Sequence, residues 1–119
     1  MARRIYITMT LCATLLVALA ANAQLPPSGE GRRAFLANNC YGCHGINAGG
    51  SPMGAPAFRT DKPDLGDVAE AVRQGESGGM PSFPKLTQTD ISNLNAYFQS
   101  LGTKAEPTFL EWWVPVPTQ

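Results

Sequence analysis

One stretch of the sequence reads Cys40-Tyr41-Gly42-Cys43-His44. Two thiols three positions apart, followed directly by an imidazole, form the pattern by which haem is attached covalently to a protein. Each cysteine can form a thioether with one vinyl group of the porphyrin, and the imidazole then lies where it can supply the proximal ligand of the iron. We therefore predict a c-type haem, with Cys40 and Cys43 as its thioethers and His44 as an axial ligand.

Three other interpretations of the motif fit the sequence less well. A structural zinc site needs four ligands, but the only further cysteine is Cys12, and His44 is the sole histidine. A thioredoxin-like redox pair belongs to a βαβ context, whereas helical and then glycine-rich sequence flanks this motif. A disulfide between Cys40 and Cys43 would be strained and would close almost no loop. Haem attachment is thus the favoured interpretation.

The N-terminus has the order of a secretory signal peptide. Arg3 and Arg4 precede an apolar stretch over residues 5–20, and a small-x-small cleavage site ends at Ala23. We predict a cleaved signal over residues 1–23 and a periplasmic protein. The alternative is an uncleaved anchor that holds the protein to the membrane, although the apolar stretch is short for a membrane span.

The predicted mature chain, residues 24–119, is long enough for one small domain. Loss of Arg3 and Arg4 lowers the basic count from 9 to 7 against 9 acidic residues, a net charge of −2. Nucleic-acid binding requires a basic face, so no nucleic-acid partner is expected. Cys12 leaves with the signal, and a chain this small has little apolar material for a core. A haem would therefore form much of that core.

Helix signals occur at three places. Ser28 can cap a first helix over residues 29–39, which leads into the haem motif. Asp64 can cap a second helix that Gly75 ends. Thr87 has the position of a third N-cap, because Asp90 stands where a capping box places an acidic side chain.

The third helix has the clearest pattern. Gly102 ends it, and its apolar stripe consists of Ile91, Leu94, Tyr97, Phe98 and Leu101. By contrast, residues 45–63 are rich in Gly, Pro and Ala without periodicity, which predicts a long loop that wraps a haem edge. No strand pattern is convincing. We predict an all-α fold with three to four short helices and long loops around one haem.

The second axial ligand of the iron is predicted to be a methionine, because no second histidine exists. Met53 follows His44 by only nine residues, so the chain would have to double around the ring quickly to reach the far face. Met80 follows a complete helix and lies in a glycine-rich loop that permits close backbone approach. Thioether ligation raises the reduction potential, which suits an electron carrier. We favour Met80 as the ligand and assign Met53 to packing.

Taken together, these residues resemble a class I, mitochondrial-type cytochrome c, as a small bacterial periplasmic member with one haem. The resemblance covers about residues 31–101. Its strongest part is the run from Cys40 to Gly45, and Met80-Pro81 and the last helix support it.

The resemblance implies specific packing and a specific hydrogen bond. An early glycine and aromatic, matched here by Gly31 and Phe35, pack on the last helix at Leu94 and Tyr97. A proline carbonyl after the motif, matched by Pro56, accepts a hydrogen bond from the proximal histidine and so raises the basicity of that ligand.

The function that the resemblance implies is reversible one-electron transfer at an exposed haem edge. Such a protein has no substrate pocket and no general base, and it is not an enzyme. A five-coordinate haem enzyme or gas sensor is an alternative, which would require Met80 to be unbound. A dedicated cytochrome subunit of a larger dehydrogenase complex is another.

The C-terminal extension, residues 103–119, departs from the compact family pattern. It contains Trp112 and Trp113 among several prolines, so the cytochrome domain is expected over residues 24–102. The extension either packs on that domain or docks a partner, since Trp is enriched at interface hot spots. The extension resembles the tails of small periplasmic cytochromes that accept electrons from quinoprotein (PQQ-dependent) alcohol dehydrogenases. The expected partners are such a dehydrogenase as donor and a terminal oxidase as acceptor.

Overall fold

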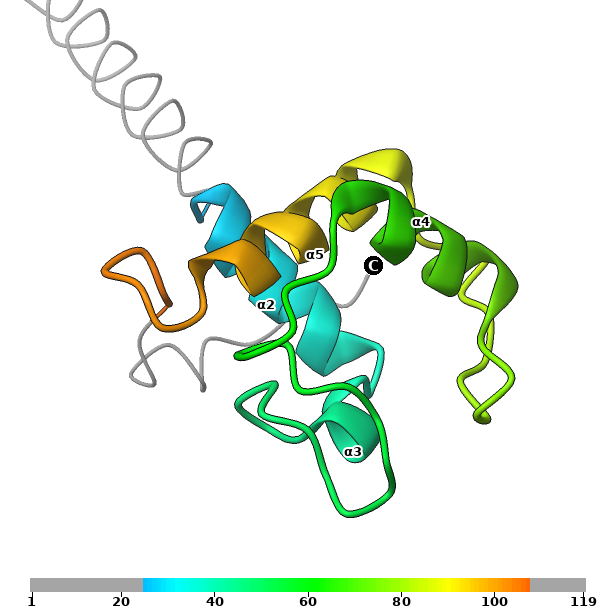
Figure 1. The fold of residues 1–119 in the computed structure, drawn as a ribbon. Coiled ribbons are helices and arrows are strands. Elements are labelled where there is room, and N and C mark those ends of the chain that lie inside the picture. The colour runs from blue at the N-terminus through cyan, green and yellow to red at the C-terminus, as the bar shows by residue number, and fades with distance from the viewer. Residues whose placement is uncertain (1–24, 108–119) are drawn as a thin grey trace, which may run out of the picture.

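The computed structural model describes residues 25–107. This part of the chain forms four helices and no strand, which confirms the predicted all-α fold of a cytochrome c (Figure 1). The helices are α2 (Pro27–Ala37), α3 (Tyr41–His44), α4 (Leu65–Gln74) and α5 (Gln88–Ser100). The predicted signal peptide and the tryptophans of the extension, Trp112 and Trp113, lie outside the described residues.

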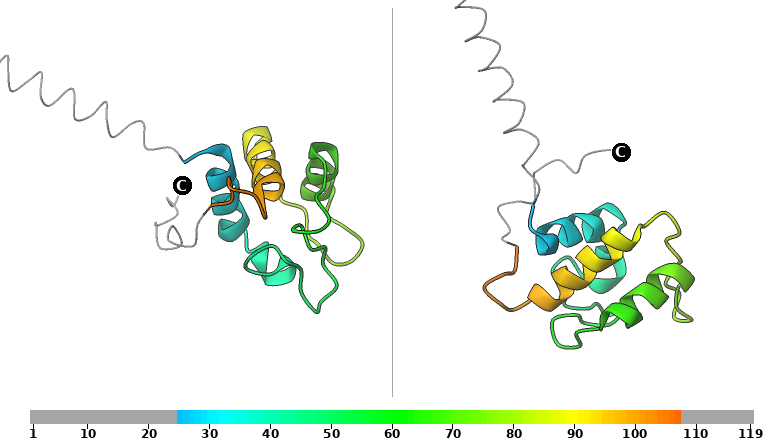
Figure 2. Two further views of the ribbon diagram at one scale, coloured as in Figure 1. Left: turned by 60° about the vertical axis from the view of Figure 1, so that its left-hand side comes forward. Right: turned by 90° about the horizontal axis from the view of Figure 1, so that it is seen from above.

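Three of the helices form one layer. Figure 2 shows α2, α5 and α4 side by side in that order, with α3 and the long loop before α4 on one side of the layer. The interface between α2 and α5 is the largest in the fold, and α4 packs on α5 less extensively. The haem motif therefore lies under a helix pair that is firmly packed.

The crossing of α2 and α5 depends on Gly31. A Cβ atom at this position would overlap the backbone carbonyl of Asn93 and would lie 2.9 Å from the backbone nitrogen of Leu94. Only glycine lets the two helices approach this closely. Next to the crossing, the Phe35 ring packs on Tyr97 with centroids 5.5 Å apart. The predicted contact between the two helices is confirmed.

The apolar core lies mainly on α5, and Phe35 of α2 packs into it. Phe35 and Ile91 are fully buried. All five stripe residues predicted for α5 are buried, and α4 adds two valines; the core consists of Phe35, Ala48, Val68, Val72, Ile91, Leu94, Tyr97, Phe98 and Leu101. The helical periodicity of the sequence thus placed the core face of α5 correctly.

Capping signals located α4 and α5 but not α2. Asp64 accepts a hydrogen bond from the backbone of Asp67 at 2.9 Å, and Thr87 and Asp90 form the predicted capping box. The prediction of a Ser28-capped helix over residues 29–39 is wrong in its bounds. Pro27 occupies the first turn, where its fixed φ angle favours an earlier start, and the Ser28 hydroxyl instead donates to the Ala105 carbonyl at 3.3 Å.

The predicted long loop after the haem motif is confirmed, since residues 45–64 contain no helix or strand. It folds back on α3, because the Gly50 amide donates to the His44 carbonyl at 2.8 Å and the Ser51 hydroxyl donates to the Cys43 carbonyl at 2.5 Å. Within residues 25–107, no helix has both the length and the apolar character needed to cross a membrane.

Candidate haem-binding site

The two cysteines lie in a single helical turn, with Cys40 at its N-cap and Cys43 as its third residue. Asn39 has a φ angle of 57°, and this left-handed residue turns the chain from α2 into α3. Cys40 is the N-cap of α3 and is half-buried, whereas Cys43 is exposed. Residues three apart lie on one side of a helix, so both thiols are placed for attachment to one planar group. Neither of them is in a disulfide.

Burial changes the chemistry of the inner cysteine. It raises the pKa of the Cys40 thiol to about 11, against a smaller opposing effect of a backbone hydrogen bond. Cys40 is therefore an uncharged thiol at neutral pH. The thiolate is the nucleophilic form of cysteine, so Cys40 itself is a weak nucleophile in this environment. An S–H group is also what adds across a vinyl double bond to form a thioether.

The imidazole of His44 is oriented by the loop that follows. Its Nδ1 atom lies 3.1 Å from the Pro56 carbonyl oxygen. A carbonyl can only accept, so Nδ1 carries the proton and Nε2 is left as the nitrogen that can ligate a metal. The Pro56 contact is the one that the resemblance to class I cytochromes implied.

Two phenylalanines hold the imidazole from another side. The Phe58 ring stacks on the His44 ring with centroids 4.5 Å apart and planes at 23°. Phe58 in turn packs on Phe98 of α5 at 4.2 Å. His44 is only 8% exposed as a result. Sequence reasoning missed Phe58, because a single aromatic in an aperiodic loop carries no signal of the residue it will contact.

The predicted second ligand, Met80, lies in the loop between α4 and α5. Its carbonyl accepts from the Glu76 amide at 3.0 Å, which closes a tight turn. The side chain is half-buried against the core. Figure 1 shows that this loop and α3 extend from the same side of α5.

Met53, by contrast, does not reach the core. It is 79% exposed, so its assignment to packing was wrong.

The sequence on either side of the motif is uncharged. No Lys, Arg, Asp or Glu occurs between Arg33 and Arg59. Two apolar side chains of this stretch are partly exposed near the cysteines, Tyr41 at 38% and Ile46 at 39%. An apolar rim of this kind suits a large apolar cofactor, because it limits access of water to the ring.

The residues present fit a haem of the c type. The donor set contains two thiols in one turn, an imidazole oriented through its other nitrogen, and a thioether on a separate loop. Within residues 25–107, no three His, Cys, Asp or Glu side chains are grouped to hold a bare metal ion. The described part of the chain therefore matches a porphyrin iron better than a zinc site, whose ligands would all be protein side chains.

This fold and this donor set define a c-type cytochrome domain. The chain belongs to the family described as cytochrome c oxidase, cbb3-type, subunit III, which matches residues 28–98. Cytochrome c domains of this kind contain covalent haem c and are electron carriers rather than enzymes.

Three curated proteins are similar to this chain over the domain. A Pseudomonas lupanine 17-hydroxylase [cytochrome c] is 41% identical over 71 residues, which cover 57% of this chain and 10% of that protein. The cbb3-type cytochrome c oxidase subunit FixP of Bradyrhizobium sp. (strain ORS 278) is 40% identical over 57% of this chain and 26% of that protein. The CcoP subunit of Cereibacter sphaeroides is 38% identical over 63% of this chain and 28% of that protein.

The chain thus spans between a tenth and a little over a quarter of the length of these relatives. No solved structure matches it.

Proposed function

We propose that this chain is a periplasmic carrier of single electrons, with one haem attached to Cys40 and Cys43 and with His44 and Met80 as axial ligands. A bound haem supplies the reversible one-electron couple of its iron. The observation that carries the proposal is the His44 imidazole, whose Nδ1 lies 3.1 Å from the Pro56 carbonyl. This contact supports the proposal because it leaves Nε2 as the nitrogen that would ligate the iron, on the same turn that contains both thiols.

The protein's own residues account for the other requirements of a carrier. Phe58 stacks on His44 and is itself packed on Phe98, and the imidazole is shielded from water. The tight turn from Glu76 to Met80 fixes the backbone that carries the thioether, in the loop between two capped helices. Side chains held by such contacts would need little rearrangement when the iron of a bound haem is oxidised or reduced.

The sharpest test is the substitution Met80→Ala. Wild-type protein is expected to show the visible bands of a low-spin c haem and a weak near-infrared band from sulfur ligation in its oxidised form. Met80→Ala should abolish the near-infrared band and lower the reduction potential, because thioether ligation favours the reduced iron. Met53→Ala is the matched control, since Met53 is 79% exposed, and it should retain the band.

A sulfur band that survives in Met80→Ala and disappears in Met53→Ala would show that the ligand is Met53. Rapid binding of carbon monoxide to native reduced protein at neutral pH would instead favour the five-coordinate alternative. The number of haems is checked by a pyridine haemochrome assay against protein concentration. One haem per chain is expected, because the chain has a single Cys-x-x-Cys-His motif.

For partners, we propose a terminal oxidase as acceptor and a quinoprotein dehydrogenase as donor. The names of two relatives, both cbb3-type oxidase subunits, support the acceptor. The donor rests on the resemblance of the tryptophan- and proline-rich tail to those of other periplasmic cytochromes. Truncation after Pro107 removes Trp112 and Trp113. It should slow reduction by the donor and leave the haem spectrum unchanged if the tail docks that partner.

A second candidate function is that of a dedicated cytochrome subunit of a larger enzyme. It is favoured by the length of the relatives, of which this chain spans 28% at most. Native purification distinguishes the two: a free carrier elutes alone, whereas a subunit elutes with its enzyme. N-terminal sequencing of the same sample tests export, because a mature protein beginning at Gln24 is expected from the predicted cleavage site.

A further inference from the structure

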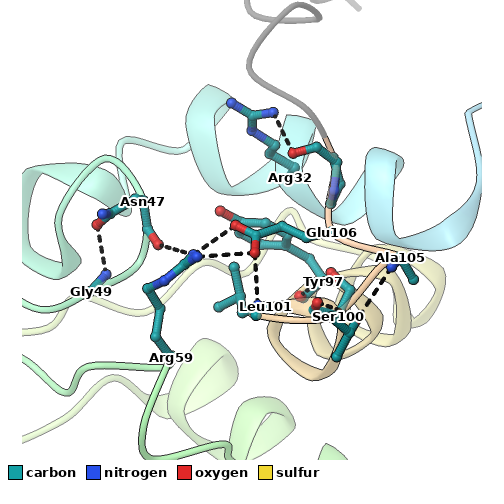
Figure 3. A network of polar contacts seen from close by, with 12 residues as sticks. Arg32, Asn47, Gly49, Arg59, Tyr97, Ser100, Leu101, Ala105 and Glu106 are labelled. Atoms are coloured by element: carbon teal, nitrogen blue, oxygen red, sulfur yellow. Dashed lines mark hydrogen bonds and ion pairs between the residues drawn. The ribbon is translucent and has the colours of Figure 1, made fainter.

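The loop segment that orients His44 is itself held in place at its end. Pro56 and Phe58 contact the imidazole, and the next residue, Arg59, extends away from the site. Its guanidinium donates two hydrogen bonds to the Glu106 carboxylate, at 2.7 and 3.0 Å. It also donates to the Asn47 carbonyl at 3.2 Å. Figure 3 shows Arg59 between these two partners.

Glu106 belongs to a segment, residues 102–107, that is fastened to the helix layer. The carboxylate of Glu106 accepts from the Gly102 amide at 2.7 Å. On either side of it, the Ala105 carbonyl accepts from Ser28 at 3.3 Å, and the Pro107 carbonyl accepts from Arg32 at 3.2 Å. Both of these donors are on α2. The segment thus links the end of α5 to α2 through contacts on both sides of Glu106.

The geometry of this pair favours a rigid link. Two parallel N–H···O bonds between a guanidinium and a carboxylate fix relative orientation as well as distance. The hydrogen bonds from Arg59 hold the pKa of Glu106 below its ordinary value, so the carboxylate is charged at neutral pH. Both side chains are partly shielded, with 34% of Arg59 and 23% of Glu106 exposed.

We propose that residues 102–107 form a clasp that positions the proximal histidine: Glu106 holds Arg59, and Arg59 holds the Pro56–Phe58 segment against His44. This inference rests on the proposed ligation of the haem by His44. Residues 102–107 follow the range 28–98 over which the family matches, whereas Arg59 lies within it. Glu106 is a positioning residue that acts through Arg59 and Pro56.

The test uses the holoprotein and the substitution Glu106→Gln, which keeps the size of the side chain and removes its charge. Two properties of His44 report its orientation: exchange of the Nδ1 proton with solvent, measured by NMR in the reduced protein, and the midpoint potential. A weaker bond to Pro56 makes the imidazole a less basic ligand, which stabilises the oxidised iron less. Glu106→Gln should therefore accelerate the exchange and raise the potential.

Glu30→Gln is the matched control. It removes the other ion pair of the described residues, Glu30 with Arg33 at 3.1 Å, which is on α2 and does not contact the Pro56 loop. Neither the exchange nor the potential should change in this variant. Equal effects of Glu106→Gln and Glu30→Gln would overturn the clasp, because the loss of any surface charge would then account for the shifts.

A double variant tests the route of the effect. Arg59→Gln should shift both properties in the same direction as Glu106→Gln. The double variant should shift them no further than Arg59→Gln alone, because both substitutions remove the same Arg59–Glu106 contact. Additive shifts would overturn the inference. Absorption spectra are recorded first. If wild-type protein shows no sulfur ligation, the proposed function and the clasp are both contradicted. If the spectra show sulfur ligation but Glu106→Gln leaves the exchange of the Nδ1 proton unchanged, only the clasp is contradicted.

Discussion

At the scale of single residues, Gly31 is the glycine of the described residues at which an added side chain would meet the closest neighbour. A side chain there would displace the Asn93 carbonyl, which belongs to the hydrogen-bonded backbone of α5 and cannot move independently. The glycine is thus required by the neighbouring helix and not by its own backbone conformation, because it lies within α2.

Gly31→Ala should therefore destabilise the protein although alanine is the better helix former. We expect a loss of about 1–3 kcal/mol in the free energy of unfolding, the usual cost of overpacking, measured by chemical denaturation. Gly78→Ala is the control, since no atom lies within 4 Å of the added methyl group. Equal stability of the two variants would contradict the close crossing.

The Arg59–Glu106 pair predicts a dependence of stability on pH. Hydrogen bonds from Arg59 lower the pKa of Glu106, desolvation opposes them, and the Gly102 amide and the charge of Arg32 add to the lowering. A carboxyl whose pKa is lower in the folded state contributes stability above its unfolded pKa and loses it as pH falls through the folded pKa.

The difference in unfolding free energy between wild type and Glu106→Gln should be constant near neutral pH and shrink below about pH 4.5. The pair is partly exposed, so the difference should be no more than about 1 kcal/mol. Urea denaturation of both proteins over this pH range measures it. A difference that grows in acid would contradict the direction of the pKa shift.

At the scale of elements, α4 depends on its cap more than α5 does. Both helices begin with a capping box, but α4 buries only two valines, whereas α5 contributes most of the core. Local signals therefore matter more where tertiary packing is weaker.

Asp64→Ala removes the bond to the Asp67 amide and should cost about 1 kcal/mol of unfolding free energy. Thermal denaturation followed by far-UV circular dichroism measures the loss. Asp61→Ala, three residues earlier on the same exposed loop, removes an aspartate that caps no helix and should change stability by less than about 0.5 kcal/mol. If Asp61→Ala costs as much as Asp64→Ala, charge and not capping stabilises this region.

At the scale of the whole molecule, the polypeptide packs unevenly. The α2–α5 pair contains most of the buried apolar side chains, whereas α3 and the loops around it are held mainly by hydrogen bonds. Protein without attached haem, such as the Cys40→Ala/Cys43→Ala variant, should therefore retain the helix pair and loosen elsewhere.

Hydrogen–deuterium exchange should show this difference. In the double cysteine variant, amides of α2 and α5 should exchange at least about tenfold more slowly than those of α3 and residues 45–63. Buried apolar contacts protect backbone hydrogen bonds from opening. The haem-containing protein should protect all of these regions. Uniform exchange in the variant would mean that the helix pair does not form without the cofactor.

Much of this fold could be predicted from the sequence, because its signals are local. The capping residues Asp64 and Thr87 act within one helical turn, and the stripe on α5 follows the helical period. The motif from Cys40 to His44 identifies its cofactor through five consecutive residues. Even the error at α2 was local, since Pro27 starts the helix earlier than the Ser28 cap suggested.

The surroundings of His44 were decided only by the tertiary structure. Phe58 reaches the imidazole from an aperiodic loop, and Arg59 meets Glu106 across 47 positions of the chain. Neither contact follows from spacing, because each depends on how the loop folds back over α3 and on where the chain turns after α5. The sequence by itself indicated the chemistry of the cytochrome domain and where its helices lie. The tertiary structure decided how firmly the His44 imidazole is held, because its contacts come from residues far apart in the chain.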